Sequence, residues 1–176
     1  MDKEILEDFK KESKNLLNEM KGILDSIEGD FEKVLELEQY GQTVDRIMGG
    51  AKSLATNFAE EFPAEHFIHQ LGDYAALCKA VGYKASQIKN NEQFYNICVA
   101  LLMDASDMLD KMLTQLGSTN VLSVSGLLSK TFLDRLKWVS NQFGEEVRAT
   151  VSTPQNSKDK KMSQTEIDDL LKKLGL

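Results

Sequence analysis

Apolar residues recur at intervals of three and four along most of this chain, and this spacing predicts α-helices. A helix turns once in about 3.6 residues, so the spacing gathers apolar side chains on one face. No segment alternates apolar and polar residues for long enough to predict a β-strand. The pattern predicts a first helix over residues 3–26, a second from residue 30 to about residue 58, a third over 63–82, a fourth over 91–116 and a fifth over 126–150.

Residues that favour helix ends lie between these segments. Gly29, Gly82 and Gly117 are expected to end the first, third and fourth helices. Asp30 is expected to cap the second helix by accepting hydrogen bonds from its free backbone N–H groups. Pro63 fits the first turn of the third helix, where no donor is lost. Five helices joined by short loops predict an all-α antiparallel bundle over residues 1–149.

Composition narrows the classes of protein to which this bundle can belong. The chain has 176 residues, 41% of them hydrophobic, which suffices for one domain with a core and a short appendage. Its formal net charge of −7 argues against nucleic acid as a partner, because neutralising phosphates requires clustered Lys and Arg. No apolar run reaches about 18 residues and no signal peptide is evident, so we expect a cytoplasmic protein that does not bind membranes.

Cysteine and histidine do not form a convincing metal site. Cys78 and Cys98 lie within helical patterns and lack the spacing of metal ligands, which predicts reduced thiols in the core. His66 and His69 are close in sequence, but no second pair of ligands accompanies them. We therefore predict no metal site and no cofactor.

The chain changes character after the bundle. Residues 150–161 contain Ser, Thr, Pro, Gln, Asn and Lys with no large apolar residue after Val151, so we assign residues 150–162 to a flexible linker. In the tail, residues 163–176, Ser163 and Glu166 form a capping box and Gly175 provides a helix stop. A helix of about twelve residues is marginal in water. We expect it to fold in a groove, either on its own bundle or on a partner.

The second predicted helix carries an unusual carboxylate. Asp45 lies beside the apolar stripe, and the positions one turn before and after it are Gly41 and Gly49. Each glycine within a helix costs about 1 kcal/mol relative to alanine. The pattern predicts a bare patch around Asp45 that a partner's backbone could approach.

The sequence Ile47-Met48-Gly49-Gly50-Ala51 resembles the His-x-Ile-Lys-Gly-Gly-Ala signature of histidine phosphotransfer domains, in particular the first domain of the chemotaxis kinase CheA. In this alignment Asp45 stands where the family has its phospho-accepting histidine, and Met48 stands where it has lysine. The order and lengths of the predicted helices are similar to that domain over most of residues 1–148. The resemblance implies a docking surface for a response regulator, without the nucleophile for phosphoryl relay.

The tail carries a second resemblance. Ser163-Gln164, Asp168-Asp169-Leu170-Leu171 and Leu174-Gly175 look like the C-terminal CheY-binding peptide of the phosphatase CheZ, and part of the segment also resembles the CheY-binding peptide of the flagellar switch protein FliM. This implies a CheY-type response regulator, carrying its own Mg²⁺, as the partner. The residues expected to contact it are Gln164, Glu166, Ile167, Asp168, Asp169, Leu170, Leu171 and Leu174.

Together the two resemblances imply a CheZ-like phosphatase that hydrolyses the regulator's aspartyl phosphate. Such an enzyme needs an amide that orients water and an acid that pairs with the regulator's lysine. Asp45 is the expected acid, Gln42 or Gln70 the amide, and Asp73 a further polar site residue, with His69 as a substitute for Gln70. Two alternatives stay open: a non-catalytic adaptor that sequesters or localises the regulator, and a structural bundle whose tail binds itself. A homodimer is also possible.

Overall fold

The computed structural model describes residues 3–117, 128–150 and 164–174, and every regular element within these ranges is a helix. The predicted all-α fold is therefore confirmed. The elements are α1 (Lys3–Ile27), the short 3-10 helix η1 (Phe31–Glu36), α2 (Leu37–Asn57), α3 (Phe67–Ala85), α4 (Glu92–Gln115), α6 (Lys130–Thr150) and α7 (Gln164–Lys173).

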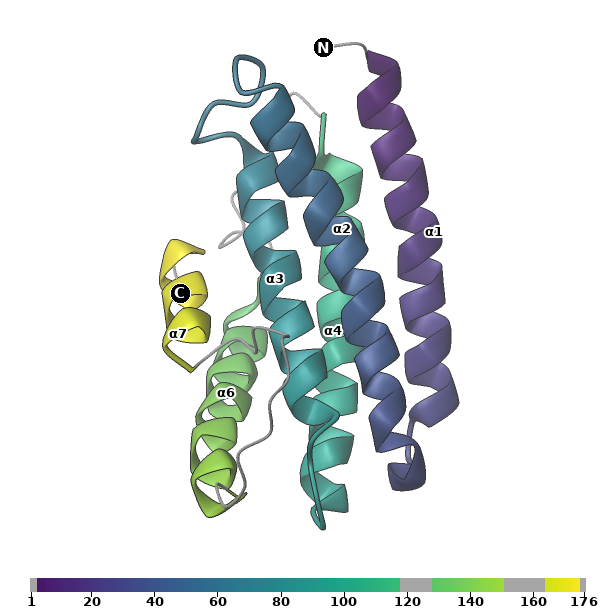
Figure 1. Ribbon diagram of the computed structural model, residues 1–176, viewed down its shortest axis with the longest axis vertical. Coiled ribbons are helices and arrows are strands. Elements are labelled where there is room, and N and C mark those ends of the chain that lie inside the picture. The colour runs from purple at the N-terminus through teal and green to yellow at the C-terminus, as the bar shows by residue number, and fades with distance from the viewer. Residues whose placement is uncertain (1–2, 118–127, 151–163, 175–176) are drawn as a thin grey trace.

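Helices α1 to α4 form the body of the fold (Figure 1). α1 packs against α2 and α4, and α3 packs against the same two helices from the other side, so consecutive helices are neighbours in an up-and-down arrangement. α6 packs on α4, and α7 packs on both α3 and α6. The two last helices therefore lie on the side of the bundle away from α1.

α3 is the central helix of the protein. It contacts α2, α4 and α7, and each of its residues is buried or half-buried. A helix that is apolar nearly all round must be covered on all sides, and small residues allow its neighbours to come close. A Cβ atom added at Gly82 would lie 2.8 Å from the ring of Tyr40 in α2, and one added at Gly72 would lie 3.7 Å from Cβ of Ala51.

Three buried tyrosines connect the helices through their hydroxyl groups. Tyr40 forms a 3.2 Å hydrogen bond with Ser106 of α4, and Tyr74 donates to the carbonyl of Ala105 at 3.1 Å. Tyr95 donates to the carbonyl of Ile27 at 2.6 Å, where α1 ends. Because a buried hydroxyl without a partner is costly, these bonds fix how α4 sits against its neighbours.

The helix ends differ from the prediction in three places. Asp30 does not cap the second helix: it forms an ion pair with Lys33 at 3.3 Å, and the 3-10 turn η1 precedes α2. Pro63 lies before α3, whose N-cap is His66. Gly82 does not end α3, because it is a packing site inside the helix.

The other predicted ends agree better. Gly29 and Gly117 have φ values of 72° and 87°, in the left-handed region that favours glycine, and follow α1 and α4 as expected. Asn91 accepts a 3.0 Å hydrogen bond from the backbone N–H of Phe94 at the start of α4. α6 begins at Lys130, after a cap by Ser129, rather than at residue 126. The predicted linker begins at residue 150, but Thr150 is the last residue of α6. The rest of the linker, the segment that follows Gly117, Ser163 and Gly175 lie outside the described residues.

Of the apolar residues that the helical spacing places on inward faces, most are buried, several such as Ile23, Ile97 and Met108 are half-buried, and two are exposed. Leu128, Phe132 and Phe143 are buried as expected, and so are the thiols of Cys78 and Cys98. Ile5 is 40% exposed, although it lies on the predicted apolar face of α1. Trp138 is 47% exposed and forms an edge-to-face contact with Phe94, with ring centroids 6.0 Å apart.

Candidate functional site

Asp45 lies at the rim of the interface between α2 and α3. Its neighbour in sequence, Val44, is fully buried in the core. Lys79 of α3 donates from Nζ to Oδ1 of Asp45 at 2.7 Å, and the two side chains are 26% and 44% exposed, respectively. The same ammonium lies 5.9 Å from the centre of the Tyr83 ring. The carboxylate is open to solvent, but it already has a cationic partner.

The glycines around Asp45 have three different surroundings. Gly41 is buried, and a Cβ atom there would lie 3.1 Å from the ring of Tyr83. A Cβ atom at Gly50 would lie 2.7 Å from the ring of Phe9 in α1. Only Gly49 faces open space, with no atom within 4 Å of an added Cβ. The prediction of a bare patch on both sides of Asp45 is therefore wrong on the Gly41 side and holds on the Gly49 side.

Gln42 is the candidate amide that the structure places beside Asp45. It is exposed and lies three residues before Asp45, which puts both side chains on one face of α2. Arg46, the next residue after Asp45, bonds Glu12 of α1 at 3.4 Å. Met48, at the position of the motif lysine, packs half-buried against the core.

Gln70 lies on a different side of α3. Nine residues separate it from Lys79, which is about two and a half turns at about 3.6 residues per turn, so the two side chains point in opposite directions. Among the described residues, its buried Oε1 atom has no hydrogen-bond partner. Because Lys79 points toward Asp45, Gln70 is not brought together with Asp45.

Asp73 belongs to a third face of α3. The α2 face of this helix carries Gly72 and Lys79, and the α4 face carries Tyr74. Asp73, Ala76, Ala80 and Lys84 follow one another at intervals of three and four residues on the remaining flank, which we call the outer flank of α3. Ala76 and Ala80 are 1% and 3% exposed. With α2 and α4 accounted for, α7 is the helix that covers this flank.

The two histidines have structural contacts. Nδ1 of His66 accepts a 3.2 Å hydrogen bond from the backbone N–H of Ile68 and so caps α3. Burial, with a smaller contribution from nearby His69, lowers the pKa of His66 below 6.5, which keeps this acceptor unprotonated. His69 Nε2 lies 3.2 Å from the carbonyl of Phe62. Within the described ranges, no three His, Cys, Asp or Glu side chains are grouped as a metal site would require.

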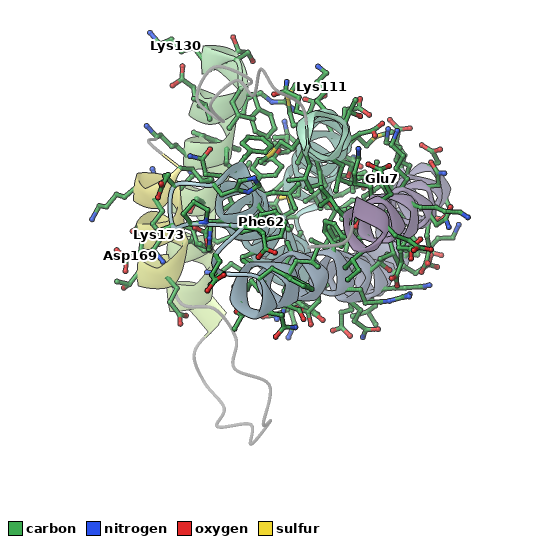
Figure 2. All side chains as sticks on the ribbon, turned by 90° about the horizontal axis from the view of Figure 1, so that it is seen from above. Glu7, Phe62, Lys111, Lys130, Asp169 and Lys173 are labelled. Carbon is green, nitrogen blue, oxygen red and sulfur yellow. The ribbon has the colours of Figure 1, made fainter. Side chains whose placement is uncertain are left out.

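The tail helix α7 lies against its own bundle. Ile167, Leu170, Leu171 and Leu174 are all buried, between 0% and 8% exposed. Its polar residues Glu166, Asp168 and Asp169 are exposed. Figure 2 looks down the bundle and shows α7 at its outer edge, with Asp169 and Lys173 on it. Gln164 begins the helix. Of the two predicted locations for the tail helix, its own bundle or a partner, the structure shows the tail on its own bundle.

Charge also joins α7 to α3. Burial lowers the pKa of Lys84, and the carboxylate of Asp168 opposes this effect, so the two groups lie close enough to interact. The ammonium of Lys84 also lies 5.8 Å from the centre of the Phe143 ring in α6. Lys84 therefore stands where the three helices α3, α6 and α7 meet.

Sequence reasoning missed both lysines of α3. Lys79 is the only charged residue between Asp73 and Lys84, in an otherwise apolar stretch. An isolated charge in a buried helix needs a partner, and this was the signal that could have predicted the ion pair with Asp45. For Lys84, which pairs with a residue more than eighty positions away, the local pattern contains no such signal.

Scans of protein-family models, curated proteins and solved structures found no match to this chain. Within the part of the chain that the structure describes, no helix combines the length and the apolar character needed to cross a bilayer.

Proposed function

We propose that this chain binds a CheY-type response regulator through the tail, residues 163–176, and accelerates hydrolysis of the regulator's aspartyl phosphate. The observation that carries the proposal is the tail sequence itself: Gln164, the acidic pair Asp168-Asp169 and the leucines that follow resemble those of a CheY-binding peptide. The helical form of residues 164–173 and their single apolar face suit such a peptide.

The surface of α2 supports the catalytic part of the proposal. In hydrolysis a water oxygen attacks phosphorus in line with the bond to the regulator's carboxylate, and that bond breaks to release inorganic phosphate. Little covalent chemistry is required of the second protein, which chiefly has to position the water. Gln42 supplies an exposed amide that can accept from and donate to that water. Asp45, three residues away, supplies an acid on the same face.

The pairing of Asp45 gives it a defined role. Lys79 already balances its charge at 2.7 Å. When the regulator docks, its active-site lysine can share or replace Lys79 as the partner of this carboxylate. The ion pair is partly exposed, and ion pairs at a protein surface contribute only about 0–1 kcal/mol, so we expect the exchange of partners to cost little. Gly49, one turn further along α2, leaves open space for the incoming chain.

A second candidate function is a non-catalytic adaptor that holds the phosphorylated regulator. The ion pair between Asp45 and Lys79 is the observation that favours it, because a neutralised carboxylate attracts the regulator's lysine less strongly. The adaptor would use the same tail and the same α2 surface, but would leave the phosphate lifetime unchanged or longer.

The test measures loss of phosphate from acyl-phosphorylated CheY, with Mg²⁺, in the presence and absence of the full chain. We expect acceleration that Gln42→Ala reduces by about 10²-fold, the usual cost of a lost positioning or stabilising group, and that Asp45→Ala reduces by a smaller factor. Gln93→Ala, an exposed amide at the start of α4, is the matched control and should have no effect.

The outcomes separate the candidates. A larger loss in Gln70→Ala than in Gln42→Ala would move the amide role to α3. Binding without acceleration would leave the adaptor, and failure of the regulator to bind any variant would refute both functions.

A further inference from the structure

We infer that the docked α7 is a latch: the bundle and the response regulator compete for the same apolar face of the tail. This inference rests on the proposed function for the identity of the competitor, and on the packing of α7 for the mechanism. The groove is formed by α3 and α6, and its occupant is the chain's own C-terminal helix.

The first argument is that the two interactions use the same residues. Ile167, Leu170, Leu171 and Leu174 are the apolar residues that the resemblances to the CheZ and FliM peptides together assign to the regulator, and these four are buried on the bundle. A ten-residue helix has room for one apolar stripe. Because one stripe cannot be buried against two proteins at once, docking on the bundle and binding to the regulator exclude each other.

The second argument concerns the groove. Ala76 and Ala80 on the outer flank of α3 are almost completely buried, and their small side chains allow α7 to approach the α3 backbone. At the end of this flank Lys84 interacts with Asp168 of α7. The groove thus offers a shallow apolar floor and a cation at one end, which complements an acidic amphipathic helix.

The latch also lies on the flank of α3 that carries one candidate site residue. Asp73 lies on the same flank, one turn from Ala76 and two turns from Ala80. When the tail leaves the bundle to bind the regulator, the outer flank of α3 becomes accessible to solvent. Binding of the regulator would therefore change which surface of α3 is open, whereas the Gln42 and Asp45 surface on α2 is exposed in either state.

The contact between α7 and the bundle is small enough to break without unfolding the bundle. A helix of this length is marginal on its own, and it contributes four buried apolar side chains to the contact. If the tail is docked for most of the time, the apparent dissociation constant for the regulator equals the intrinsic one divided by the undocked fraction. Any change that weakens docking without touching the regulator-binding residues should then tighten binding.

Two substitutions in the groove provide that change. Lys84→Glu places a like charge opposite Asp168, and Ala80→Gln adds bulk to the floor of the groove. Lys89→Glu, an exposed lysine in the turn after α3, reverses the same charge outside the groove and is the control. All three are made in the full chain, and exchange of the amides in α1 and α4 verifies that the bundle is folded.

The first readout does not involve the regulator. Amide hydrogen exchange at Leu170 and Leu171 should be slow in the unaltered chain and in Lys89→Glu, and clearly faster in both groove variants. The second readout is the affinity of the full chain for CheY, which should increase by about threefold to tenfold in both groove variants and stay the same in the control.

Failure of the latch and failure of the proposed function give different results. Exchange of the Leu170 and Leu171 amides at the rate of an unstructured peptide in the unaltered chain would overturn the latch, and so would faster exchange without tighter binding. If exchange is slow in the unaltered chain and fast in the groove variants, the tail docks on the bundle. If no variant then binds CheY, the regulator is not the competitor, and the proposed function fails.

Discussion

The two interfaces on either side of α3 are built differently. Toward α2, glycines let whole rings rest on the backbone: Tyr40 lies against Gly82, and Tyr83 lies against Gly41. Toward α7, two alanines meet a short helix that brings four apolar side chains. The first interface joins two helices of 21 and 19 residues, and the second involves a helix of 10.

The difference separates a permanent contact from one that can be exchanged. The α2–α3 interface cannot open without exposing a large part of the core, including Tyr40 and its hydrogen bond to Ser106. The α7 contact can be lost while helices α1 to α4 remain packed, because these four helices contact one another directly. A surface that must bind a partner can be part of the exchangeable contact with α7, but not of the permanent α2–α3 interface.

The largest expected effect breaks the permanent interface. Gly82→Val should lower the free energy of unfolding by about 3 kcal/mol, because an added Cβ atom alone would lie 2.8 Å from the ring of fully buried Tyr40. Urea denaturation measures the change. The matched control is Gly49→Ala, where no atom lies within 4 Å, which should gain about 1 kcal/mol from helix propensity. A loss below about 1 kcal/mol at Gly82 would show that Tyr40 moves freely.

A smaller effect is expected from loss of the exchangeable contact. A chain that ends at Thr150 should still unfold cooperatively, with a Tm lower by about 3–6 °C, since a loss of about 1–2 kcal/mol shifts the Tm of a protein of this size by that amount. Calorimetry measures the transition. The full chain with Leu171→Asp should match the truncated one. Loss of cooperative unfolding would instead make the tail part of the folding unit and favour the structural-bundle hypothesis.

The smallest effect concerns the first residues of α3, the helix that both interfaces share. Burial lowers the pKa of His66 below 6.5, so the unfolded chain takes up a proton at higher pH than the folded one. The contribution of His66 to stability is thus complete above about pH 6.5 and is lost as the pH falls through the folded-state pKa. Protonated Nδ1 cannot accept from Ile68, and loss of such a cap costs about 1 kcal/mol.

Comparison of unfolding free energies at pH 7 and pH 5 tests this effect of His66. His66→Asn retains a capping acceptor without a titrating group, so its stability should change less over this range. An identical change in both proteins would assign the pH dependence to other residues.

Much of the fold could be predicted from the sequence, because helical periodicity is a local property. The stripes of α1, α2 and α4 and the glycines after α1 and α4 all follow from spacing within one segment. Pro63 and Gly82 were misplaced because the same residue types serve two purposes. Gly82 is needed for the approach of Tyr40, from a helix about forty residues earlier, and no pattern within α3 distinguishes this from a helix stop.

The candidate site was less predictable. Gln42 and Asp45 share one helix, so their common face follows from an interval of three. Whether Gln70 and Asp73 join them depends on how α3 is rotated, and this is set by Gly72, Lys79 and the tyrosine rings that pack between helices. The ion pair of Asp45 with Lys79 and the packing of α7 on α3 are contacts between segments distant in sequence, and helical periodicity cannot predict such contacts.

The covering of α3 on every side has a consequence for how this sequence can vary. Every residue of α3 is buried or half-buried, so many changes there must be matched by a change in a second segment. α1 has a broad solvent face, where charged residues can be exchanged freely. Relatives of this chain should therefore diverge fastest along α1 and retain the small residues of α3, and comparison of those positions is the most sensitive way to recognise them.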